Sequence, residues 1–118
     1  MEITIQERTL SFALKIIELY KVCKAQNEYI LSKQLLKSGT SIGANIREAG
    51  AGFSKKDFLH KMTIASKEAR ETQYWILLLS ESKLVQFDAK EYLDEIQNII
   101  NILTSIVKTT QKNLNDNI

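Results

Sequence analysis

Hydrophobic positions recur at intervals of three and four residues in four long segments, which is the period of an α-helix. The segments are 6–25, 29–49, 54–83 and a fourth that opens at 88, and short polar or glycine-containing stretches separate them. The chain contains no proline, the residue that most strongly interrupts helices. Residues 113–118 are polar, and we expect them to fray. The pattern predicts an all-α protein, an antiparallel up-and-down four-helix bundle that forms a single domain over 1–118.

The first and fourth segments carry aliphatic residues on more than one side. In the first, we predict a core stripe at Leu10, Leu14, Ile17 and Cys23, widened by a second set at Phe12, Ile16, Leu19 and Tyr20. In the fourth, the predicted core positions are Tyr92, Ile96, Ile99, Leu103, Ile106 and Leu114, flanked by Ile100, Ile102 and Val107. Such an excess indicates either a broad core face or an interface between subunits, and the sequence leaves both interpretations open.

The second segment combines an apolar stripe with unusually small residues. The stripe is Leu35, Gly39, Ile42, Ile46 and Ala49, and a polar row of Ser38, Ser41, Asn45 and Glu48 runs beside it. A glycine inside a helix costs about 1 kcal/mol relative to alanine. We therefore expect close approach of another helix or another subunit along this segment. The predicted positions for helix packing or a subunit interface are Gly39, Ser41, Gly43 and Asn45.

Two helix starts carry capping signals. Ser54 and Asp57 resemble a capping box, with Phe53 and Phe58 placed to form a hydrophobic staple around it. The same arrangement recurs at the fourth helix, where Asp88 and Glu91 frame the cap and Phe87 and Tyr92 form the staple. The connection around 24–28 has no comparable signal, and its boundaries are the least certain.

Composition excludes several classes of protein. The formal net charge is only +2, there is no run of about eighteen apolar residues that could span a membrane, and the start does not resemble a signal peptide. The single cysteine, Cys23, lies in an apolar pattern and is expected to be a buried thiol. We expect a soluble, cytoplasmic protein that makes no contact with a membrane.

The residues needed for catalysis are scarce. His60 is the only histidine, so a di-iron site with two histidines cannot form, and one cysteine with one histidine disfavours zinc. Serine and threonine residues in the second segment have no nearby base. We predict no catalytic residue, no metal site and no cofactor, and we expect that the protein is not an enzyme.

Basic residues form a row on the third segment. Lys56, His60, Lys67 and Arg70 follow one another at intervals of four, seven and three, with Lys55 beside them. A solvated charged face is one interpretation. The other is a nucleic-acid-binding surface, which a ring of subunits would make continuous. Its candidate residues are Lys55, Lys56, His60, Lys67 and Arg70, while Tyr74 and Trp75 are expected to be core aromatics.

The run 36–49, LKSGTSIGANIREA, resembles the signature of a bacterial four-helix bundle family typified by proteins encoded in intervening sequences of 23S ribosomal RNA genes. Stretches 54–58 and 65–75 are similar to the same family. The resemblance implies a homopentameric ring and kinship with the accessory variability protein of diversity-generating retroelements, which binds nucleic acid and a reverse transcriptase through a basic surface. It implies basic-face roles for Lys56, Lys67 and Arg70. It also implies packing roles for Ser41, Gly43 and Asn45.

Two functions remain open at this point. The first is a non-enzymatic homo-oligomer that binds structured nucleic acid, RNA foremost but also DNA, through the third segment. The second is a protein–protein interaction adaptor without a nucleic-acid role, in which the oligomer presents helical grooves to a protein partner.

Overall fold

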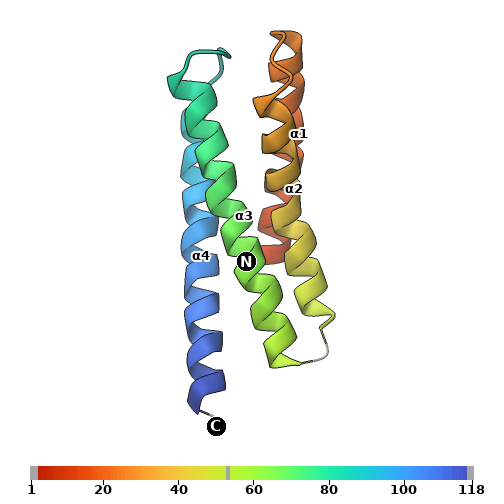
Figure 1. The fold of residues 1–118 in the computed structure, drawn as a ribbon, viewed down its shortest axis with the longest axis vertical. Coiled ribbons are helices and arrows are strands. Elements are labelled where there is room, and N and C mark those ends of the chain that lie inside the picture. Colours follow the sequence, from red (N-terminus) through yellow and green to blue (C-terminus); the bar gives the residue numbers. More distant parts are fainter. Residues whose placement is uncertain (1–2, 53, 117–118) are drawn as a thin grey trace.

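The computed structural model describes residues 3–52 and 54–116 and contains four helices. They are α1 (Ile5–Ala25), α2 (Leu31–Gly50), α3 (Lys55–Glu81) and α4 (Ala89–Asp116). Each helix packs against the next in the chain, and α1 also contacts α4, which closes the bundle (Figure 1). The predicted all-α antiparallel four-helix bundle is therefore confirmed. None of these helices has an apolar stretch that could cross a membrane.

The core is built from one face of each helix. In α2 all five residues of the predicted apolar stripe are buried, and in α3 the buried face includes Met62, Ala69 and Ile76. Among the described residues, one polar contact crosses this core: Thr72 Oγ1 lies 2.9 Å from Ser38 Oγ and 2.7 Å from the Glu68 carbonyl oxygen, so its single proton has two acceptors within hydrogen-bond distance. These bonds satisfy a buried polar pair that would otherwise be costly.

The predicted core stripe of α1 is wrong at three positions. Leu10, Leu14 and Ile17 are exposed, at 52%, 58% and 36% of their surfaces. The buried face consists of Phe12, Ile16, Leu19 and Cys23, together with Thr9. Both sets have helical spacing, so only the positions of α2 and α4 decide which one faces inward.

In α4 the core stripe is broader than a single row. Ile96, Ile99 and Leu103 are buried as expected, and the predicted flanking residue Ile100 is buried with them. Tyr92, Ile106 and Leu114 are only partly buried. Here a broad core face accounts for part of the aliphatic excess.

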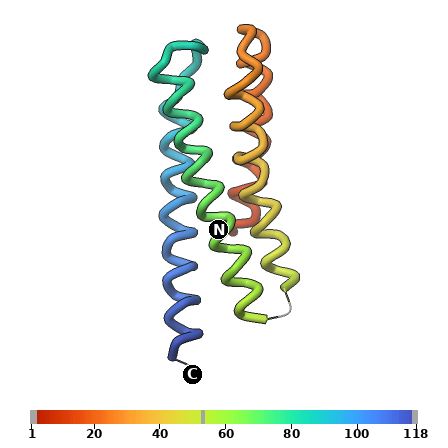
Figure 2. The backbone as a smooth tube through the Cα atoms, in the orientation of Figure 1, coloured from red at the N-terminus to blue at the C-terminus, as the bar shows by residue number. Residues whose placement is uncertain are grey.

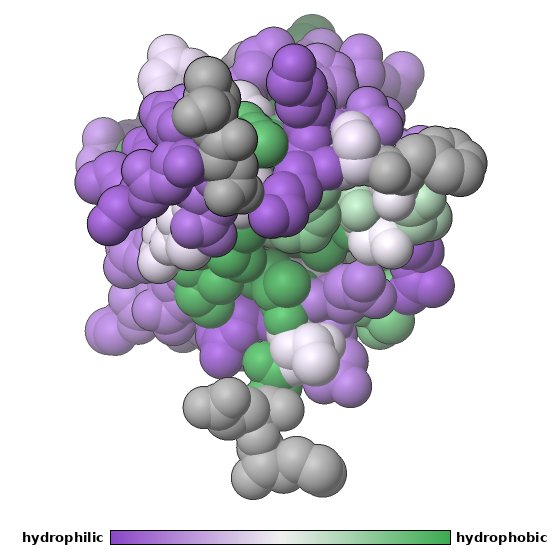
Figure 3. All heavy atoms as spheres, turned by 90° about the horizontal axis from the view of Figure 1, so that it is seen from below, coloured by the Kyte–Doolittle hydropathy of each residue, from purple (hydrophilic) through white to green (hydrophobic). Residues whose placement is uncertain are grey.

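The lower end of the bundle lacks α1. The Arg8–Glu95 and Lys15–Glu91 pairs fix the register of α1 against α4, so about the last four to five turns of α4 extend past the start of α1 (Figures 1 and 2). Seen from this end, hydrophobic surface lies between the helices inside a largely hydrophilic rim (Figure 3). The half-buried state of Ile102 and Ile106 fits this missing cover. The helix α4 includes 113–116, so the predicted fraying is wrong for these residues, while 117–118 lie outside the described residues.

The helix starts confirm the predicted caps at Ser54 and Asp88, but no hydrogen bond among the described residues runs back from the Asp57 or Glu91 carboxylate to complete a capping box. The Ser54 hydroxyl accepts a hydrogen bond from the Asp57 N–H at 3.1 Å, and the Asp88 carboxylate accepts one from the Lys90 N–H at 3.2 Å. The rings of Phe87 and Tyr92 meet edge to face, with centroids 6.1 Å apart. Phe53, and with it the predicted staple to Phe58, lies outside the described residues.

The turn after α1 is built from residues that carried no obvious signal. Asn27 adopts the left-handed conformation (φ 66°), and the N–H groups of Asn27 and Glu28 bond the carbonyl oxygens of Lys24 and Cys23, as in a Schellman motif. The Gln26 side chain then donates to the Gln86 carbonyl oxygen at 2.9 Å and accepts from the Gln86 N–H at 2.8 Å. This pair ties the α1–α2 turn to the α3–α4 turn.

Glu28 caps α2 from outside the helix. Its carboxylate accepts hydrogen bonds from the N–H groups of Ile30, Leu31 and Ser32 at 2.7–3.1 Å. Burial raises the pKa of Glu28, but the backbone hydrogen bonds from Ser32, Leu31 and Ile30 lower it by more, so the net pKa lies below its ordinary value of 4.5. The ionised carboxylate therefore stabilises the helix N-terminus.

We expect Glu28→Ala to lower the free energy of unfolding by about 1 kcal/mol near pH 7, as loss of a helix cap does. Because the folded pKa is below the unfolded one, the contribution is complete above about 4.5 and disappears as the pH falls through the folded pKa. Urea unfolding at several pH values measures both effects. Glu18→Ala, at an exposed position of α1, is the control. An equal loss in both variants, or a loss that persists in acid, would contradict the capping role.

Candidate nucleic-acid interface

The predicted basic row lies on the outer face of α3. Lys56, His60, Lys67 and Arg70 are all exposed, and Lys55 is the exposed first residue of the helix. Helical spacing places the row opposite the buried face that contains Ala65, Thr72 and Ile76. The structure therefore brings all five predicted residues to the solvent, four of them along one line.

The cations of this row form no ion pairs among the described residues, although Glu68 lies close enough to Lys67 for the two charges to interact. Five ion pairs occur among the described residues: Arg8–Glu95, Lys15–Glu91, Lys21–Glu18, Lys61–Glu48 and Lys90–Asp94. Within the described parts of the chain, no carboxylate lies within 4.0 Å of Lys55, Lys56, Lys67 or Arg70. Lys61, which the sequence places beside the row, is instead bound to Glu48 of α2 at 3.1 Å.

Arg70 connects the row to α4. Its Nη2 donates to Thr104 Oγ1 at 3.0 Å. One turn along α3, Gln73 Nε2 donates to Gln97 Oε1 at 2.9 Å, and Gln97 Nε2 donates to Asn101 Oδ1 at 2.9 Å. The sequence prediction missed these α4 residues. The detectable signal was the spacing of Gln97, Asn101, Thr104 and Lys108, which share one helix face.

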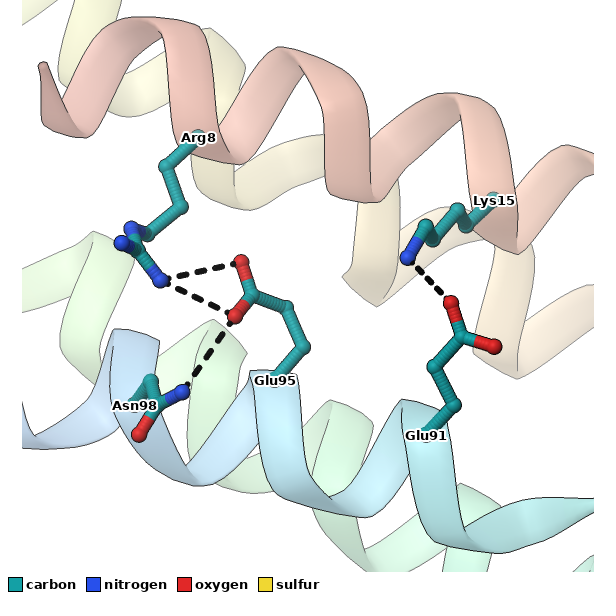
Figure 4. A network of polar contacts seen from close by, with 5 residues as sticks. All are labelled: Arg8, Lys15, Glu91, Glu95 and Asn98. Carbon is teal, nitrogen blue, oxygen red and sulfur yellow. Dashed lines mark hydrogen bonds and ion pairs between the residues drawn. The ribbon is translucent and has the colours of Figure 1, made fainter. Parts of the chain in front are cut away.

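The opposite side of the bundle shows a different charge pattern. In the seam between α1 and α4, Arg8 Nη1 binds both carboxylate oxygens of Glu95 at 3.0 and 3.3 Å, and Asn98 donates to the same carboxylate (Figure 4). Lys15 Nζ donates to Glu91 at 2.5 Å, and this bond, opposed by partial burial, raises the pKa of Lys15. An open cavity of about 560 Å³ lined mainly by charged and polar residues lies here, but most of these charges cancel in pairs.

His60 lies beside the turn between α2 and α3. It lines a small cavity near the α2–α3 turn together with Glu48, Asp57 and Lys61, and Lys61 already pairs with Glu48. No cluster of three or more potential metal ligands occurs in the part of the chain that the structure describes. Tyr74 is 55% exposed at the end of the basic row, so its prediction as a core aromatic is wrong, whereas Trp75 is partly buried.

Gly39 and Gly43 of α2 face α1 of the same chain. A Cβ placed on Gly39 would lie 2.9 Å from Ile16 Cγ2, and one on Gly43 would lie 3.3 Å from Thr9 Oγ1. Ser41 and Asn45 are half-buried, and their side chains donate to the carbonyl oxygens of Lys37 and Ser41 within α2. Close approach within the bundle thus accounts for Gly39 and Gly43 without a subunit interface.

An exposed apolar face nevertheless lies along α1 and α2. Leu10, Leu14 and Ile17 line the solvent side of α1. Beside them, Leu10 and Ala13 share a shallow pocket with small α2 residues, including Gly43 and Ala44. Three exposed aliphatic side chains at one-turn spacing are unusual for a surface that contacts only water.

Comparisons with known proteins agree with this architecture. A family model described as "23S rRNA-intervening sequence protein" matches residues 1–105. A crystal structure from Bacteroides thetaiotaomicron is 42% identical, with a TM-score of 0.84, and the match covers 89% of this chain and 99% of the other. It is described as a protein with unknown function from the S23 ribosomal protein family. A comparison with curated proteins finds no match.

Proposed function

The chain belongs to the 23S rRNA-intervening sequence protein family, and from this premise we propose that it is a non-enzymatic homo-oligomer that binds structured RNA through the outer row of α3. One observation carries the proposal. The exposed cations of α3 have no carboxylate partner among the described residues, whereas the acids of the α1–α4 seam are paired. Unpaired lysine and arginine side chains in line are suited to phosphates, which they bind with release of counterions.

The charge row predicts a salt-dependent affinity. We expect the protein to bind a structured fragment of ribosomal RNA, with an affinity that falls steeply as salt rises. The triple variant Lys56→Glu, Lys67→Glu and Arg70→Glu should weaken binding at least tenfold. It should also flatten the slope of log K against log salt by roughly 0.9 for each duplex phosphate that the variant no longer neutralises. Fluorescence anisotropy over a salt series measures both quantities.

The control is a second triple variant that makes the same change of charge on other parts of the surface. Lys21, Lys33 and Lys83 are exposed and lie outside the row, so their conversion to glutamate should weaken binding far less. Failure of the wild-type protein to bind at low salt would reject the proposal. Equal losses in the two triple variants would reject the α3 row as its site.

The exposed apolar face on α1 and α2 supports the homo-oligomer. We propose that copies associate there, in a ring of five as the family resemblance implies. Native mass spectrometry should then give five times the 13.5 kDa mass of one chain. Leu10→Lys with Leu14→Lys should shift the mass toward the monomer while the helical content is retained. A monomeric wild-type protein, or an oligomer that this variant leaves intact, would contradict the proposal.

The same face also favours the second candidate, a protein–protein interaction adaptor. Capture of partners from native lysate, with and without nuclease, separates the two functions. Protein partners that resist nuclease and disappear with Leu14→Lys would support the adaptor, while partners that vanish with nuclease would support RNA binding.

A further inference from the structure

The helices α3 and α4 pack against each other, and the strip of outer surface along their line of contact carries polar and basic side chains but no acid over most of its length. We call this strip the α3–α4 groove. The Arg70–Thr104 bond fixes the register of the two helices. Helical spacing then places a set of residues along the two edges of the groove. They are Thr63, Ser66, Arg70 and Gln73 on α3 and Gln97, Asn101, Thr104, Lys108 and Lys112 on α4.

The nearest acids lie beside this groove or beyond its ends, and Asp116 is about one turn past Lys112. Glu68 is on the α2 side of α3, where burial and Glu71 raise its pKa while Lys67 of α3 and Lys37 of α2 oppose the shift. Asp94 lies about one turn before Gln97 and is paired with Lys90 at 2.6 Å. A surface free of carboxylates over about 22 Å, the rise from Gln97 to Lys112, is compatible with a polyanion along its whole length.

The two halves of the groove differ in chemistry. The half toward the α1–α2 turn contains the chain of amides from Gln73 through Gln97 to Asn101. The other half contains Arg70, Lys108 and Lys112. Amides both donate and accept hydrogen bonds, which is what a ribose 2′-hydroxyl requires, whereas ammonium and guanidinium groups only donate and suit phosphates.

We propose that this groove follows one strand of the RNA, with Arg70, Lys108 and Lys112 at its phosphates and Gln73, Gln97 and Asn101 at its ribose 2′-hydroxyls. The inference rests on the proposed function. It adds α4 as the second side of the interface and names ribose as the group that makes the protein prefer RNA to DNA. Binding replaces the amide–amide bonds by amide–ribose bonds, so the amides remain satisfied in both states.

The test uses three hairpins of one sequence: RNA, DNA with thymine for uracil, and 2′-O-methyl RNA, which keeps the phosphates but lacks the hydroxyl proton. We expect the wild-type protein to bind RNA at least tenfold more tightly than the other two. Gln97→Ala with Asn101→Ala should lower the affinity for RNA to nearly that for 2′-O-methyl RNA and leave the affinity for DNA within about twofold. Gln34→Ala with Asn113→Ala removes the same two exposed amides elsewhere and should change nothing.

Lys108→Glu with Lys112→Glu tests the phosphate half and should weaken all three hairpins at least tenfold. If RNA and 2′-O-methyl RNA bind equally, or if the amide variant keeps their ratio, ribose recognition is overturned while the proposed function stands. If the lysine variant binds as the wild type does, α4 is not part of the interface. If none of the three hairpins binds at low salt, the proposed function itself is overturned. Circular dichroism shows that each variant retains its helices.

Discussion

Replacement of Phe12 by alanine is expected to lower the free energy of unfolding by about 3–5 kcal/mol, the usual cost of emptying a buried aromatic site. Phe12 is 1% exposed and belongs to the core. Leu14, two residues along the same helix, is 58% exposed, and Leu14→Ala should change the stability of the single chain, measured at low protein concentration, by no more than about 0.5 kcal/mol. The two hydrophobic positions are close in sequence but differ in what they contact.

Urea unfolding followed by circular dichroism at two protein concentrations checks this difference. If Leu14 lies in a contact between copies, its effect will depend on concentration, whereas the effect of Phe12 will persist under both conditions. A loss for Leu14→Ala comparable to that for Phe12→Ala at both concentrations would mean that α1 is rotated relative to the structure.

The face of α1 shows how far hydrophobic periodicity can predict a fold. The existence and the length of the four helices follow from the pattern, since each has apolar residues at helical spacing. In α2 the buried face was also predictable, because glycine and serine positions leave only one continuous apolar stripe. In α1 two aliphatic stripes compete, and hydrophobicity alone cannot decide which of them the neighbouring helices cover.

The candidate interface was predictable on α3 and not on α4 for a related reason. The row from Lys56 to Arg70 lies on one helix, so spacing alone defines it. Thr104 meets Arg70 across 34 residues of sequence, through a register that depends on the core packing and on the α3–α4 turn. The role of Glu28 was missed for two reasons. Glu28 lies two residues before the N-cap position, Ile30, and it is not one of the usual capping residues serine, threonine, asparagine or aspartate, although it accepts the capping hydrogen bonds.

The close contact between α1 and α2 predicts a second large loss of stability. Gly39→Leu is expected to lower the free energy of unfolding by about 3 kcal/mol, at the upper end of the usual cost of overpacking. A Cβ at this position would already lie 2.9 Å from Ile16 Cγ2 and 3.0 Å from Ile16 Cγ1, and Ile16 is fully buried. Removal of a helical glycine returns only about 1 kcal/mol, so the clash dominates.

Two further variants separate this clash from other effects of leucine, with the free energy of unfolding in urea as the measure. Gln34→Leu introduces the same side chain at an exposed position of α2 and should be nearly neutral. Ile16→Ala alone should destabilise by about 2–5 kcal/mol because it leaves a cavity. In the double variant with Gly39→Leu, the new side chain can occupy that cavity. The double variant should therefore lose less unfolding free energy than the sum of the losses in the two single variants. Strict additivity, or a neutral Gly39→Leu, would show that α1 and α2 are not held at the distance that the glycine permits.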